Sequence, residues 1–143
     1  MSLGRRRINS HDKLWRMIAA KKGQIIYHSI RLLPHEEEIA QLFAALGCTV
    51  ELIPTDRSHG RKTADAIIDG LEWEFKTPRG NSTRTIERIL KKAHKQSENI
   101  VIDTHHVHLP EELTLRKIRH EAQKYNKHQR IKVILKSKRI IDL

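Results

Sequence analysis

The most constraining feature of this sequence is the stretch from Thr63 to Lys76, TADAIIDGLEWEFK. Asp69-Gly70 is typical of the two-residue loop of a β-hairpin, because both loop positions need a positive φ that Gly and Asp tolerate better than β-branched residues do. With these two residues in the loop, positions 68, 67 and 66 pair with 71, 72 and 73, and Asp65 lies directly opposite Glu74. The sequence therefore predicts a hairpin of fixed register.

Alternation along the two strands separates an apolar face from a polar one. The apolar face carries Ala64, Ala66, Ile68, Leu71, Trp73 and Phe75, and the polar face carries Asp65, Ile67, Glu72, Glu74 and Lys76. Opposed residues have Cβ atoms roughly 4.5–5.5 Å apart, so two carboxylates there repel unless something compensates them. Asp65 and Glu74, with Lys76 beside them, would form an oxygen-ligand site for a divalent cation. The alternative is an ordinary solvated outer face.

Asp65, followed by Glu74-Phe75-Lys76 at the end of a hairpin, resembles the D…ExK signature of the PD-(D/E)XK nuclease superfamily. The wider run is similar to the C-terminal tRNA nuclease domains of CdiA-type contact-dependent growth inhibition toxins. The similar segments are EEEIAQLFAALG, CTVELIP, DAIIDGLEWEFKTP and KKAHKQSENIVID, within residues 24–143. Thr63-Ala64 stands where the superfamily usually has a Pro before the first Asp, a departure that the superfamily often tolerates.

The resemblance implies that Asp65, Glu74 and the backbone carbonyl of Phe75 hold a divalent metal, Mg²⁺ or Mn²⁺, with Zn²⁺ as a further option. Lys76 would orient the attacking hydroxide or stabilise the pentacovalent oxyanion. Gln96, in a KQS run like that of the family, would touch the water or the phosphate.

A glutamate from the helix expected at residues 35–46 also reaches the metal in the nucleases that this chain resembles. Glu36 is the first candidate, by its distance from the helix-ending Gly47, and Glu38 is the second. The first-turn carboxylates also have a purely structural explanation, because they lie at the positive end of the helix dipole.

The chain carries 28 Lys and Arg against 17 acidic residues, for a formal charge of +11. Such a charge favours polyanions, with nucleic acid first and an anionic membrane surface second. No run of 18 apolar residues is present, so membrane insertion is not expected.

Cations recur along one face of each of two expected basic helices, at residues 83–97 and 113–125. Arg79 and Arg84 flank the first helix N-terminus, whose free N–H groups suit a phosphate. The two stripes are expected to bind nucleic acid, although a merely solvated face would look the same; their members are Arg84, Arg88, Lys91 and Lys95, and Arg116, Lys117, Arg119 and Lys124.

The predicted fold class is α/β, a mixed β-sheet flanked by helices with a restriction-endonuclease-like PD-(D/E)XK core. Residues 1–23 read as a basic lead and a helix at 11–22, and residues 24–143 as the nuclease domain. Strands are expected at 24–33, 49–53, 99–103, 131–135 and 139–143 besides the hairpin, with a polar loop at 55–63; for 24–33 a helix extension is the alternative. The strand at 99–103, NIVID, should be central because it is apolar on both faces.

The three neighbouring histidines and the single cysteine allow two further interpretations. His105, His106 and His108 are a conceivable zinc site, but no cysteine completes four ligands. Cys48 reads as a small buried hydrophobe.

The function that fits best is a metal-dependent endonuclease with tRNA as the favoured substrate. A DNA endonuclease of the same fold and a non-catalytic nucleic-acid-binding module remain as alternatives, as does an assembly module for an acidic partner. The resemblance further implies delivery as the C-terminal module of a larger secreted protein, action in the bacterial cytoplasm, and a cognate, acidic immunity protein.

Overall fold

The computed structural model describes residues 23–28, 33–54, 64–125 and 130–143. Seven strands form one mixed sheet in sequence order: β1 (Gln24–Ile26), β2 (Thr49–Leu52), β3 (Ala66–Ile68), β4 (Leu71–Lys76), β5 (Asn99–Asp103), β6 (Arg130–Ile134) and β7 (Ile140–Asp142). Three helices accompany them: α2 (Pro34–Ala45), α3 (Thr83–His94) and α4 (Glu111–Gln123). The expected α/β class with a mixed sheet is confirmed. The expected helix at 11–22 and loop at 55–63 lie outside the described residues.

The Asp69-Gly70 hairpin forms with the predicted register. Ala66 pairs with Trp73, Ile67 with Glu72 and Ile68 with Leu71. Asp69 has φ 47° and Gly70 has φ 86°, the positive values that a two-residue loop requires. The expected apolar face is buried at Ala66, Ile68 and Trp73, so local turn chemistry and alternation decided this element.

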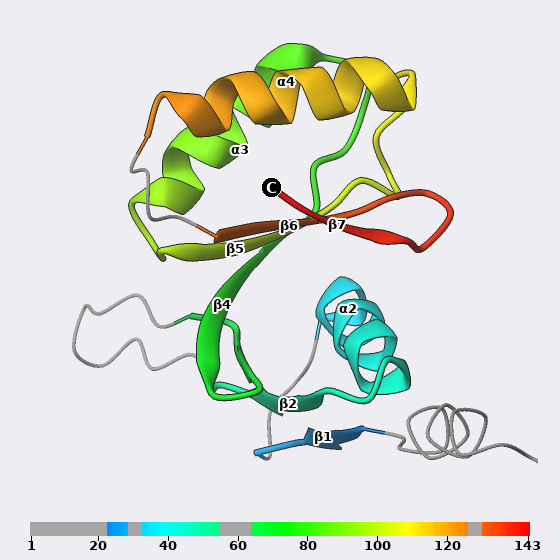
Figure 1. Ribbon diagram of the computed structural model, residues 1–143, viewed down its shortest axis with the longest axis vertical. Helices are drawn as coiled ribbons and strands as arrows, with labels where there is room; N and C mark the ends of the chain where they lie inside the picture. The colour runs from blue at the N-terminus through cyan, green and yellow to red at the C-terminus, as the bar shows by residue number, and fades with distance from the viewer. Residues whose placement is uncertain (1–22, 29–32, 55–63, 126–129) are drawn as a thin grey trace, which may run out of the picture.

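Strand β4 joins two halves of the sheet. Its first three residues pair with antiparallel β3, and its last three, from Glu74 to Lys76, pair with parallel β5. The strand curves around α2, which lies inside the bend (Figure 1). Ile39 and Phe43 of α2 pack there with Trp73 and Phe75 in one buried cluster. The change of pairing partner falls at Glu74.

The β5–β7 half of the sheet is covered on its other face by α3 and α4, which lie next to each other (Figure 1). α3 connects parallel β4 to β5, and α4 connects parallel β5 to β6. Ile86 and Leu90 of α3 and Ile118 of α4 share a second buried cluster with Ile100 and Ile102 of β5. As predicted, β5 is central, with parallel neighbours on both sides.

Several boundaries differ from the sequence-based expectations. β1 ends at Ile26, well short of residue 33, and residues 29–32 are outside the described part. α3 ends at His94, so Lys95 is its C-cap and Gln96 lies beyond it, because the helix gives way to a turn before β5. α4 begins earlier than expected, at Glu111, because Pro110 provides its N-cap. Among the described helices, none is long and apolar enough to cross a membrane.

Candidate active site

Asp65 lies just beyond the last hairpin pair and is tied to β4 through both its backbone and its side chain. Its amide donates to the carbonyl of Trp73 at 3.0 Å, and its Oδ2 accepts the amide of Phe75 at 2.7 Å. The strand ladder stops at the pair Ala66–Trp73, so direct pairing of Asp65 with Glu74, expected from the register, is wrong. The physical reason is that the Asp65 carboxylate accepts the hydrogen bond of the Phe75 amide, which a further strand residue would otherwise have accepted through its backbone carbonyl. It still lies next to Glu74, because the two carboxyl groups interact.

Glu74 and Lys76 lie on the part of β4 that pairs with β5. Their side chains form an ion pair with 3.3 Å between Lys76 Nζ and Glu74 Oε1. The Glu74 side chain is only 9% exposed, and that of Lys76 is 18% exposed. The alternative of a solvated outer face therefore fails for these two residues, whereas Glu72 on the same strand is exposed.

Glu36 comes from the first turn of α2 and completes a cluster of three acids. Burial raises its pKa, and the charge of Asp65 raises it further. Burial likewise raises the pKa of Asp65, against the lowering effects of the Phe75 amide, Lys76 and His35. Glu38, the second helix candidate, is exposed and lines a separate cavity.

Glu74 has the most perturbed pKa of the cluster. Burial raises it from the ordinary 4.5 to about 7; Asp65 and Glu36 contribute in the same direction, and Lys76 only partly offsets them. One ammonium group is thus too little positive charge for three neighbouring carboxylates. A site of this kind attracts additional positive charge or retains a proton.

The Phe75 backbone adds a neutral oxygen to the site. Its amide points to the β3 edge, where it meets Asp65 Oδ2. In an extended strand the N–H and C=O of one residue project to the same side, so the Phe75 carbonyl points to this edge beyond the end of β3. Carboxylates and a backbone carbonyl are the oxygen donors that Mg²⁺ and Mn²⁺ prefer.

The oxygen atoms of this site are of the kind that bind a divalent cation, but their side chains are not yet arranged around one. Across the described ranges, no three His, Cys, Asp or Glu side chains are already grouped to hold an ion. Glu74 Oε1 is engaged by Lys76, and Asp65 Oδ2 by the Phe75 amide. The acids would bind a cation by turning their free oxygens toward it, which would also relieve their mutual repulsion.

Gln96 is not brought into this cluster. It follows the C-terminal end of α3, and its buried Oε1 has no hydrogen-bond partner among the described residues. Its neighbour Asn99 begins β5 and donates its Nδ2 to the carbonyl of Glu72, near the start of β4. The candidate acids Asp65 and Glu74 lie further toward the other end of that strand.

The expected cationic residues are exposed, in the loop before α3, on α3 and on α4. Arg79 lies in the loop that leads from β4 to α3, and the Ser82 hydroxyl caps α3 by accepting the amide of Arg84 at 3.2 Å. Within the described part of the chain, ion pairs are absent for the following exposed groups: Arg79, Arg84, Arg88, Lys91, Lys95, Arg116 and Arg119. These charges remain free for an anionic partner.

Two expected members of the α4 stripe are already paired. Lys117 and Lys124 both reach Oε1 of Glu121 at 3.0 Å. Glu121 is only 1% exposed and lies beside His94, whose ring stacks on Tyr125 at 3.7 Å. The sequence interpretation missed Glu121, although its spacing of three from Ile118 places it on the buried side of the helix.

The three histidines lie in a loop attached to the loop before α3. Gly80 donates its amide to the His106 carbonyl at 3.2 Å and accepts the His108 amide at 2.7 Å. His105 stands edge-on to His106, with 5.0 Å between ring centroids. This bridge holds Arg79 near the carboxyl ends of β4 and β5. Cys48 is partly buried, against the first core cluster.

One solved structure shares the fold of this chain. It is the CdiA-CT/CdiI toxin and immunity complex from Burkholderia pseudomallei, with a TM-score of 0.63 at 19% identity over 85% of this chain and 98% of that one. At this identity the likeness concerns the fold alone. None of the curated proteins matches the sequence significantly.

Residues 62–140 match the family described as the contact-dependent growth inhibition CdiA C-terminal domain. The match covers more than half of the chain and includes Asp65, Glu74 and Lys76. The chain therefore belongs to the CdiA C-terminal domain family of contact-dependent growth inhibition.

Proposed function

We propose that this protein is a metal-dependent endonuclease toxin with a PD-(D/E)XK-type active site at Glu36, Asp65, Glu74 and Lys76. The observation that carries the proposal is a buried Glu74 that feels the charges of Asp65, at the hairpin edge, and Glu36, on α2, while Lys76 supplies its ion pair. Structural ion pairs rarely place three acids around one base, because the excess negative charge costs stability. Such costs are typical of functional sites.

In this proposal each residue has a distinct task. Glu36, Asp65, Glu74 and the Phe75 carbonyl would hold a divalent cation, Mg²⁺ or Mn²⁺. The cation would supply water activation and neutralise charge on the scissile phosphate. Lys76, freed from Glu74, would position its ammonium group against the attacking oxygen or the phosphate oxygens.

The proposed substrate is nucleic acid, with tRNA favoured. The exposed cations of α3 and α4 offer unpaired positive charge to a phosphate backbone. After Lys76 the chain runs through Arg79 to the Ser82-capped N-terminus of α3, whose free N–H groups suit a phosphate. Gln96, beyond the C-terminal end of α3, would contribute through bound substrate rather than through the acid cluster.

The family also indicates a biological setting. We infer that the domain is delivered as the C-terminal module of a larger secreted protein and acts in the cytoplasm of a bacterial target. The solved structure that shares the fold is a complex of a toxin and an immunity protein. By analogy, an acidic immunity protein would cover the cationic face of this domain.

The test is incubation of the purified protein with total RNA and plasmid DNA, each with and without Mg²⁺, Mn²⁺ or Zn²⁺. The proposal expects RNA cleavage that requires metal and is lost in Glu74→Gln. Glu72→Gln is the matched control, because Glu72 lies two residues earlier on the same strand but is exposed. Cleavage of DNA but not of RNA would show that the substrate is DNA. Nucleic-acid binding without cleavage in any of the metals would show that the protein is a binding module rather than an enzyme.

A further inference from the structure

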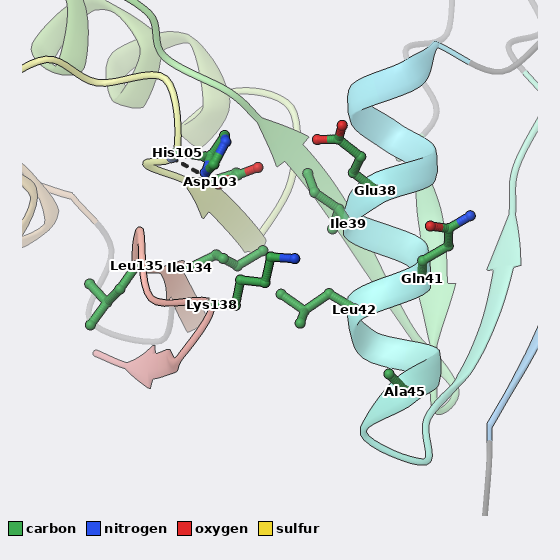
Figure 2. A pocket seen from close by; sticks show the side chains of 10 residues that line it. All are labelled: Glu38, Ile39, Gln41, Leu42, Ala45, Asp103, His105, Ile134, Leu135 and Lys138. Atoms are coloured by element: carbon green, nitrogen blue, oxygen red, sulfur yellow. Dashed lines mark hydrogen bonds between the residues drawn. The ribbon is translucent and has the colours of Figure 1, made fainter.

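A cavity lies between α2 and the carboxyl ends of β5 and β6, apart from the acid cluster (Figure 2). It has a volume of about 480 Å³. Its walls are apolar, with Ile39 and Leu42 from α2 facing Ile134 from β6. Its polar lining residues are Glu38, Gln41, Asp103, His105 and Lys138. The volume falls in the usual range for small-molecule pockets, about 300–1,000 Å³.

Asp103 is the unusual residue of this cavity. It is only 5% exposed, and Figure 2 shows its carboxylate directed toward the space between the two walls. One oxygen, Oδ1, accepts the amide of His105 at 3.0 Å. No cation of the described residues forms an ion pair with it. The other carboxylate oxygen opens to the cavity, where the N–H donors of a ligand could reach it.

We propose that this cavity binds a guanine base of the nucleic-acid substrate. Guanine presents N1–H and the N2 amino group side by side, and a carboxylate accepts both. Its O6 lies next to them and would accept from the Lys138 ammonium group. Adenine and cytosine place an acceptor beside their amino group, and uracil has a single N–H between two acceptors. The aliphatic walls would cover the two faces of the flat ring.

The cavity adjoins the proposed active site through two elements. Lys76 of β4 pairs with Ile102 of β5, and Asp103 is the next residue, so its side chain projects to the opposite face of the sheet at the same carboxyl end. Glu36 belongs to the acid cluster, whereas Glu38, two residues along the same helix, lines the cavity. A nucleotide close to the scissile phosphate could place its base here by passing around the carboxyl end of the sheet. This inference rests on the proposed nuclease function for its substrate, and it adds a base preference near the cleavage position.

The test measures binding of GMP, IMP, AMP, CMP and UMP to the full chain in chelator, by titration followed in methyl NMR spectra. GMP is expected to bind at least tenfold more tightly than AMP, CMP or UMP, and to shift the methyl signals of Leu42 and Ile134. IMP lacks the N2 amino group and is expected to bind about tenfold more weakly than GMP, in line with loss of one arm of a bidentate contact. Equal binding of all five, or GMP binding that leaves both methyl signals unmoved, would overturn the inference.

Asp103→Asn should abolish the preference for GMP, because an amide offers only one acceptor oxygen. The variant keeps Oδ1 for the His105 amide, so the loop retains its hydrogen bond. Glu112→Gln, at an exposed position of α4, is the control with the same loss of charge and should bind GMP as the wild type does. A GMP preference that persists in Asp103→Asn would also overturn the inference.

Failure of this inference can be told apart from failure of the proposed function. GMP binding is measured without metal, and Glu74→Gln should leave it unchanged while RNA cleavage is lost. Selective GMP binding by a protein that cleaves no RNA would remove the nuclease proposal and keep the pocket. RNA cleavage without selective GMP binding would keep the nuclease proposal and remove the guanine pocket.

Discussion

Replacing Glu74 by Gln should make the metal-free protein more stable at neutral pH. Burial and the neighbouring acids make the ionised form of the Glu74 carboxyl unfavourable in the folded protein. Its pKa in the fold is about 7, against an ordinary 4.5. Between these two values the unfolded chain has released the proton while the folded chain retains it. The free energy of unfolding therefore falls as the pH rises through this window, and the loss is complete above pH 7.

The magnitude follows from the size of the shift. The difference between 4.5 and about 7 corresponds to roughly 3 kcal/mol as an upper limit. Asp65 and Glu36 share part of this repulsion, and Glu74 gives up its ion pair with Lys76 when it is replaced. We therefore expect the wild type to lose about 1–3 kcal/mol between pH 5 and pH 8 relative to Glu74→Gln.

The assay is urea unfolding in chelator across this pH range, followed by tryptophan fluorescence, to which the buried Trp73 contributes. Glu72→Gln serves as the matched control and should keep the pH dependence of the wild type, because Glu72 is exposed. The ten histidines are common to all three proteins, so the difference between the curves isolates Glu74. Parallel curves for the wild type and Glu74→Gln would refute the account of a repelling acid cluster.

Three further results are expected. Mn²⁺ should raise the thermal midpoint of the wild type but not of Asp65→Asn, because a ligand stabilises only the fold that binds it; equal gains would place the ion elsewhere. The affinity for tRNA should fall steeply with salt in filter-binding titrations. Arg88→Ala should reduce the slope of log K against log salt by about 1. An unchanged slope would mean that this face of α3 does not contact the nucleic acid. Glu121→Gln should lower the free energy of unfolding by about 1–3 kcal/mol in urea, because it weakens two ion pairs at a buried carboxylate; a neutral result would mean that buried water replaces the lost contacts.

The hairpin and the helices were predictable because their signals are local. Asp69-Gly70 selects the turn, and Pro34 and Gly47 bracket α2. The apolar run at 99–103 marked β5 as central. These features depend on residues within a few positions of one another, so the sequence alone was sufficient.

The arrangement around the candidate site was predictable only in part. The sequence indicated that Asp65 and Glu74 lie together, but not that Asp65 caps the Phe75 amide or that β4 changes partners at Glu74. Those features depend on β5, which pairs with β4 from about 26 residues further along the chain. The Asp103 cavity was missed for the same reason, because α2 and β6 meet only in the packed fold.

The central claim is that Glu74 is part of a metal-dependent nuclease site, and its most direct test is single-turnover cleavage of tRNA in Mg²⁺ or Mn²⁺ by matched variants. We expect Glu74→Gln to cleave at least a hundredfold more slowly than the wild type, in line with the usual effect of losing a group that stabilises developing charge. The exposed neighbour variant, Glu72→Gln, should cleave at the wild-type rate, and Glu74→Gln should still bind tRNA with unchanged affinity. Cleavage by Glu74→Gln at the wild-type rate would contradict the assignment of this cluster as the active site.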